Sequence, residues 1–258
     1  MLENEPPLLP GRPEETNALE PTTVPTPPDL PGDNVEDREP IPDLIGAAEA
    51  VLRQPHRIFN RIGESDGRRL AFHLVILSML GLLGYGLVVG TFSGGQQFWA
   101  APLKVAGGIL ASGLICLPSL YIFSCLAGSR ASLQQVMGLV AGLTAIMTFL
   151  LVGFAPVAWI FSQSTNSIPM MGFLHLAFWS VSMYFAVAFF KAGFETLVTN
   201  RENSILGIWV TVFVIVVLQM STALCPIIGS GDSFLPQEKK FFVGHWADNF
   251  TGRNRTTP

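Results

Sequence analysis

Long hydrophobic runs separated by short polar stretches occupy most of the chain from residue 70 to residue 228. Each run reaches the roughly 20 residues that an α-helix needs to cross a hydrocarbon core about 30 Å thick. The five runs cover residues 70–90, 103–126, 136–161, 170–190 and 205–228. The pattern therefore predicts an all-α, polytopic membrane protein. Residues 68–229 are expected to form a bundle of five transmembrane helices, followed by a C-terminal tail at 230–258.

A different pattern precedes the first run, in residues 43–64. Its apolar residues recur mostly at steps of three and four, so they gather on one face of a helix. They are Leu44, Ile45, Ala48, Val51, Leu52, Ile58, Phe59 and Ile62. Asp43 suits the N-cap position, and Pro55 must break or kink the element. Two short helices are therefore expected, and in the third hydrophobic run Pro156 similarly predicts a kink or an early exit.

Basic side chains lie beside this apolar face. Arg53, Arg57 and Arg61 favour a helix in the plane of the lipid headgroups, where arginine is attracted to anionic lipid. The alternative is a helix packed on the cytoplasmic face of the bundle itself. The three arginines and Phe59 are the candidate interaction residues of this segment.

Residues 1–42 differ from the rest of the chain in composition. They contain eleven prolines and no aromatic residue, and residues 1–43 carry eleven acidic side chains against Arg12 and Arg38. Such a stretch cannot bury enough apolar surface to offset the entropy lost on ordering. It is expected to be a disordered, acidic tail that meets a soluble protein partner.

The overall composition agrees with a chain embedded in a lipid bilayer. Hydrophobic residues make up 49% of it and charged residues only 13%. Many of the basic residues flank hydrophobic runs on one predicted side, namely Arg53, Arg57, Arg61, Arg68, Arg69, Arg130, Lys191 and Arg201. Positive loops face the cytoplasm, so the N-terminus is predicted inside and, with five spans, the C-terminus outside a bacterial inner membrane. No nucleic-acid partner is expected.

Ionisable residues within or beside the hydrophobic runs are few. His73, Lys104, His175 and Lys191 all lie near the end of a run, where long side chains can extend to the headgroups. Glu195 follows Lys191 by one helical turn and is placed to pair with it. The sequence therefore predicts no charged group deep in the membrane.

Polar and small residues inside the runs suggest helix contacts. Gln219 is the deepest strongly polar side chain, and a hydrogen bond to a neighbouring helix is expected in preference to a substrate contact. Gly86 and Gly90, and likewise Gly138 and Gly142, are four residues apart. Such pairs allow close helix approach, either within one protomer or between protomers of a homo-oligomer.

Signatures of enzymes and metal sites are nearly absent. The chain has no H-E-x-x-H, no C-x-x-C and no P-loop. One G-x-S-x-G match, around Ser65, falls in a charged stretch without the buried strand that a nucleophile elbow requires. The three cysteines suit free thiols. No catalytic activity, cofactor or metal is expected.

Two segments resemble known families. Residues 50–62, with Pro55-His-Arg-Ile-Phe, resemble the segment that precedes the five membrane helices of Yip1-domain proteins. A longer stretch is similar to a family of uncharacterised bacterial multi-pass membrane proteins. Its motifs are Cys116-Leu-Pro-Ser-Leu-Tyr-Ile-Phe, Gly128-Ser-Arg, Ala155-Pro-Val and Ser162-Gln-Ser-Thr-Asn-Ser-Ile-Pro-Met. The Yip1 resemblance implies a role in organising membrane partners, without catalysis.

These observations lead to two functional hypotheses. The first is an integral membrane scaffold or accessory subunit, Yip1-like, that engages partners through its tail and amphipathic segment. The second is a transporter or channel for a small solute, with Gln219 near its path. A scaffold should be packed throughout, whereas a transporter should contain a continuous polar cavity.

Overall fold

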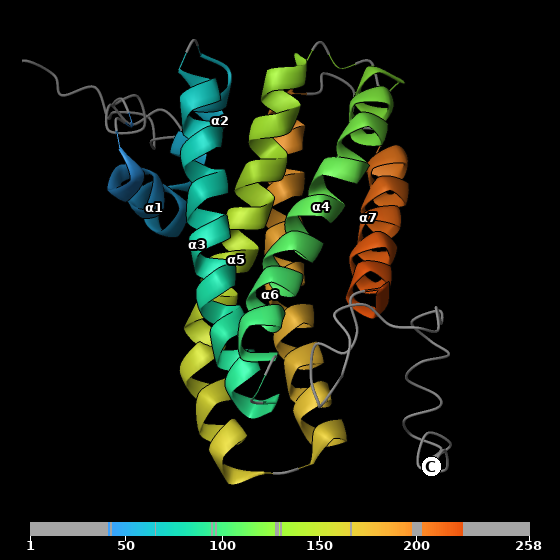
Figure 1. Ribbon diagram of the computed structural model, residues 1–258. Coiled ribbons are helices and arrows are strands. Elements are labelled where there is room, and N and C mark those ends of the chain that lie inside the picture. Colours follow the sequence, from blue (N-terminus) through green and yellow to red (C-terminus); the bar gives the residue numbers. More distant parts are fainter. Residues whose placement is uncertain are drawn as a thin grey trace, which may run out of the picture.

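A computed structural model describes residues 41, 43–64, 66–93, 95, 97–126, 129, 131–165, 167–197 and 203–223. Within these residues the chain forms α-helices and no β-strand, which confirms the predicted all-α class. The helices are α1 (Leu44–Arg53), α2 (Pro55–Ile62), α3 (Gly67–Ser93), α4 (Gln97–Leu126), α5 (Leu133–Ser164), α6 (Ile168–Leu197) and α7 (Asn203–Ala223) (Figure 1). The tails predicted at 1–42 and 230–258 lie outside the described residues, apart from Ile41.

Four helices, α3 to α6, are long and apolar enough to cross a membrane, as the hydrophobic pattern predicted. The fifth predicted span corresponds to α7. This helix has 21 residues, and its apolar stretch, Leu206–Met220, is shorter than those of the other four. The described residues therefore supply four membrane-capable helices and one shorter apolar helix.

Helix α5 forms the centre of the bundle. It packs against α3, α4 and α6, whereas α7 packs on α4 (Figure 1). In α5, 67% of the most apolar stretch is buried inside the protein, against 28–33% in the other three long helices. A helix that is apolar on all sides and enclosed by others is the expected core of such a bundle.

The start of α5 is defined by a capping box. The side chain of Ser132 accepts a hydrogen bond from the backbone N–H of Gln135, and the Gln135 side chain accepts one from the backbone N–H of Ser132. Together they satisfy two donors that the first helical turn leaves open. At the other end, α5 continues through Pro156 to Ser164, so the helix does not end at this proline. The kink or early membrane exit at Pro156 stays a prediction.

Helices α1 and α2 form a helix pair that breaks at Gln54. The carboxylate of Asp43 accepts a hydrogen bond of 2.9 Å from the N–H of Gly46 and caps α1. Pro55 is the first residue of α2, a position where its missing N–H costs no helical hydrogen bond. The break that the sequence pattern predicted at this proline is confirmed.

The apolar face of the helix pair packs on the bundle. Its buried residues are Ala47, Ala50, Val51, Ile58, Phe59 and Ile62, and the two helices contact α3, α5 and α6. Protein therefore covers most of this face, as the alternative placement on the bundle expected. The location of the helix pair in the plane of the lipid headgroups stays a prediction. Only part of the predicted face remains open, since Ile45 and Leu52 on α1 are exposed.

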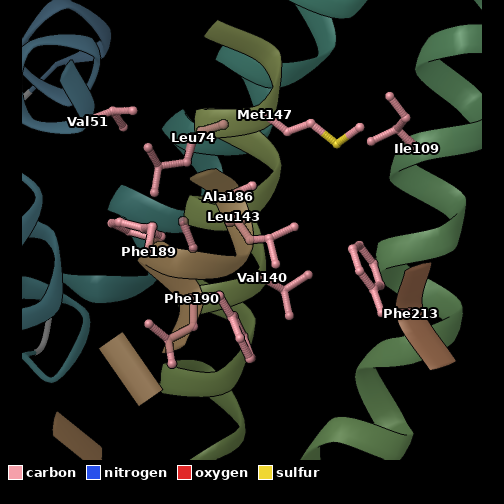
Figure 2. Packing of buried hydrophobic residues seen from close by; sticks show 14 of the residues in the cluster. Val51, Leu74, Ile109, Val140, Leu143, Met147, Ala186, Phe189, Phe190 and Phe213 are labelled. Atoms are coloured by element: carbon pink, nitrogen blue, oxygen red, sulfur yellow. The ribbon is translucent and has the colours of Figure 1, made fainter. Parts of the chain in front are cut away.

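Large apolar side chains fill the space between the long helices. Figure 2 shows Met147 of α5 extending toward Ile109 of α4, while Phe189 and Phe190 of α6 lie near Leu143 and Val140 of α5. A stacked aromatic series continues the core toward α7, with ring centroids 5.0 Å apart between Phe190 and Trp209. Dense packing of this kind holds the helices in one arrangement.

Candidate functional site

A hydrogen bond between two buried side chains joins α3 to α6. The hydroxyl of Tyr85 lies 2.6 Å from Nδ1 of His175, and the two rings meet edge to face with centroids 5.7 Å apart. Tyr85 is 1% exposed and His175 6% exposed. Polar groups enclosed in an apolar bundle are costly, and they mark candidate functional positions in membrane proteins.

The second ring nitrogen of His175 has no hydrogen-bond partner within the described residues. When the Tyr85 O–H donates to Nδ1, the neutral imidazole carries its proton on Nε2. That N–H is then a donor without an acceptor, a state that costs about 1–3 kcal/mol when buried. An acceptor oxygen of a bound molecule or of water would remove this cost.

A lysine lies at the same level of the bundle as Tyr85. Gly86, the next residue of α3, is so close to α4 that a Cβ placed on it would overlap the Cα of Pro102. Lys104 follows Pro102 by two residues and is only 1% exposed. The structure thus corrects the expectation that this side chain extends to the headgroups, because protein encloses it.

The alignment of α7 along α4 places Gln219 at the same level of the bundle as Lys104. The indole N–H of Trp209 donates to the carbonyl of Cys116 and to the hydroxyl of Ser119, each at 3.3 Å. From this point α7 runs antiparallel to α4. Gln219 follows Trp209 by ten residues, about 15 Å along α7. Lys104 precedes Cys116 by twelve residues, about 18 Å along α4 in the same direction.

Four helices therefore each contribute one polar side chain to a common level. We name Tyr85, Lys104, His175 and Gln219 the polar layer. Lys104 is the eighth residue of α4, so it lies about 10 Å inside that end of the helix. The Tyr85 hydroxyl donates to Nδ1 and keeps the imidazole proton on Nε2, so the Lys104 ammonium and the His175 Nε2–H are the donors of this layer that can stabilise an oxygen atom carrying negative charge.

The described residues contain no group of three or more His, Cys, Asp or Glu side chains that could hold a metal ion. Farther along the same face of α6, seven residues after His175, the hydroxyl of Ser182 is buried and without a partner in the described part of the chain. The face of α6 directed into the bundle therefore carries two unsatisfied polar atoms.

The three arginines that were predicted to be interaction residues form local contacts on the helix pair. Arg53 lies 3.1 Å from Glu49, Arg57 donates to Gln54 at 3.2 Å, and Arg61 pairs with Glu64. The exposed ion pair of Arg53 and Glu49 contributes little, about 0–1 kcal/mol. In contrast, Lys191 and Glu195 form no ion pair with each other in the structure.

Phe59 has a different environment from the arginines. Its ring contacts Phe189 of α6, with centroids 4.7 Å apart. A Cβ on Gly193 would lie 2.6 Å from the same ring. Phe59 therefore occupies a notch that the glycine leaves on α6, and its role is to attach α2 to the bundle.

The four glycines that were predicted to allow close helix approach can now be placed in the bundle. A Cβ on Gly138 would lie 2.8 Å from Ile62 of α2, and one on Gly142 would lie 2.7 Å from Phe189. Gly86 faces Pro102, as described above, and Gly90 is buried in α3. Each of the first three glycines lets another element of the same chain approach closely.

Comparison with known proteins gives no further guide to the site. The chain matches no family model, no curated protein and no solved structure.

Proposed function

We propose that the protein is a membrane scaffold or accessory subunit, Yip1-like in architecture, with five spans and a cytoplasmic N-terminus in a bacterial inner membrane. The observation that carries the proposal is the attachment of the helix pair to the bundle. Phe59 and Ile62 fill notches at Gly193 and Gly138, on two different long helices. The pair therefore fixes the base of the N-terminal segment on a rigid support.

The fifth span is part of this proposal. Its support is the length of α7, because 21 helical residues extend about 32 Å, close to the hydrocarbon thickness of about 30 Å. The basic residues Arg68 and Arg69, at the start of α3, favour a cytoplasmic location for that end of the bundle. An odd number of spans then places the far end of α7 outside.

The scaffold function can be tested through the acidic N-terminal segment. The full chain and a variant lacking residues 1–42 are purified in mild detergent, and the proteins that accompany each are quantified by mass spectrometry. We expect the shorter chain to insert normally, to unfold at the same temperature and to lose a specific partner. Identical sets of accompanying proteins would contradict the proposed role of this segment.

The polar layer favours a second candidate function, transport of a small polar solute. Lys104 and His175 are enclosed by protein, and His175 and Ser182 carry polar atoms without a partner in the described residues. A transport path would make these positions accessible to water, whereas a packed scaffold would keep them dry.

Cysteine labelling distinguishes the two functions. In a background with the three native cysteines replaced, Ser182→Cys is treated with a water-soluble thiol reagent in intact membranes. Thr91→Cys, at an exposed position in α3, serves as the labelled control. We expect no reaction at residue 182, and rapid labelling there would favour transport.

A further inference from the structure

A groove with a volume of about 520 Å³ separates α6 from α7. Its walls are mainly apolar and come from both helices, and they include Trp179, Met183 and Val187 of α6 and Val210, Val214 and Val217 of α7. The polar residues Ser180 and Tyr184 also line the groove, and the Ser180 hydroxyl donates to the carbonyl of Leu176. The groove therefore suits a hydrocarbon occupant.

A cationic side chain lies at one end of this groove. Lys191 is exposed and forms no ion pair with any described residue. Gly193, two residues further on, packs against Phe59 of α2. Lys191 is consequently at the end of the bundle that carries the helix pair and Arg68, within reach of the headgroups by extension of its side chain.

The dimensions of the groove fit one fatty acyl chain. The lining residues of α6 run from Leu176 to Lys191, a distance of about 22 Å along the helix, which exceeds the roughly 15 Å depth of one leaflet. At about 30 Å³ for each water-sized group, the volume holds on the order of 17 methylene-sized groups. A helix about 10 Å wide would need on the order of 1,700 Å³ over the same length.

We propose that the groove between α6 and α7 binds an anionic glycerophospholipid, with one acyl chain along the groove and the phosphate paired with Lys191. The apolar walls accept the chain, and the ammonium selects the charge of the headgroup. This site does not depend on the scaffold function, because either a scaffold or a transporter would present the same groove to the bilayer.

The test compares two lipids that share their acyl chains and differ in headgroup charge. Binding of phosphatidylglycerol and phosphatidylcholine to the full chain in detergent is measured by native mass spectrometry and by the rise in unfolding temperature. We expect tighter binding of phosphatidylglycerol. Lys191→Gln should weaken phosphatidylglycerol binding about fivefold, the effect of roughly 1 kcal/mol per basic group at an anionic surface, and leave phosphatidylcholine binding unchanged.

Three further variants make the test specific. Lys191→Arg should keep the preference for phosphatidylglycerol, and so should Arg69→Gln, which removes an exposed cation at the same end of the bundle. Ala188→Phe adds bulk to the groove wall at an exposed position. It should weaken the binding of both lipids.

Four results would overturn the proposal. They are equal binding of the two lipids, an equal loss in Arg69→Gln and Lys191→Gln, an unchanged lipid affinity in Ala188→Phe, and a stabilisation by inorganic phosphate as large as that by phosphatidylglycerol. The last result would indicate an ion site without an acyl chain.

Discussion

The hydroxyl of Tyr85 and Nδ1 of His175, 90 residues apart in the chain, lie 2.6 Å from each other inside the bundle. Helices α3 and α6 both pack along α5, so this bond adds a direct polar link between two helices on the surface of the central one. Replacing Tyr85 by Phe keeps the ring and removes only the hydroxyl. The buried imidazole then loses its partner at Nδ1.

We expect Tyr85→Phe to lower the free energy of unfolding by about 0.6–2 kcal/mol. The lower value is the average for hydrogen bonds between membrane helices, and the upper one reflects a buried group left unsatisfied. Thermal unfolding in detergent measures the change. Tyr184→Phe, the same chemical change at a side chain 71% exposed, should have almost no effect, and equal losses in both variants would contradict the role assigned to the Tyr85 bond.

Gly193→Ala should destabilise the protein by about 1–3 kcal/mol. The added methyl group would lie 2.5 Å from Leu139 and 2.6 Å from Phe59, so packed side chains must move. Gly153→Ala is the matched control, since nothing lies within 4 Å of a Cβ at that position of α5. There the substitution should be neutral or stabilise by up to about 1 kcal/mol through helix propensity. If both variants lose stability to the same extent, close approach at Gly193 is not the reason.

Phe59→Ala should release the helix pair from the bundle. Truncating a buried phenylalanine costs about 3–5 kcal/mol, and Phe59 is a main contact of α2 with α6. Limited proteolysis between residues 43 and 64 reports the release, because protease can cut a helix only after it opens. Leu52→Ala, at a side chain 63% exposed, should remain as resistant as the unaltered chain. Resistance of Phe59→Ala to protease would show that other contacts hold the pair.

Reporter fusions test the proposed topology. A fusion at Asn200 should read cytoplasmic and one at Asp248 external, since the basic residues around the first span favour an inside N-terminus and five spans reverse the side. Two cytoplasmic readings would mean an even number of spans, with α7 not crossing the membrane.

The sequence predicted those features of the fold that depend on local pattern. The hydrophobic runs identified α3 to α6. The cap at Asp43 and the break at Pro55 could also be predicted, because each depends only on neighbouring residues. The surface that covers the helix pair could not be predicted, because helical periodicity identifies an apolar face without showing whether lipid or protein covers it. The notches at Gly138 and Gly193 that receive Ile62 and Phe59 arise only once distant helices are brought together.

The polar layer was missed for two physical reasons. The second span was predicted to begin at residue 103, which put Lys104 at the membrane edge, but α4 begins at Gln97 and so carries the lysine two turns into the helix. The partner of His175 lies on a helix three spans earlier, and no local signal connects it to Tyr85. The polar residue types themselves were visible, but their common level required the register between helices.

The packing of α7 on α4 has a consequence for how the chain assembles during synthesis. The ribosome completes α5 and α6 before α7 exists, yet the docking surface for α7, with the carbonyl of Cys116 and the hydroxyl of Ser119 that receive the Trp209 indole, belongs to the earlier α4. That surface must stay uncovered in the membrane until the last helix arrives. A nascent chain stalled before Asn203 should therefore leave Cys116 open to a lipid-soluble thiol reagent that no longer reacts once α7 has docked.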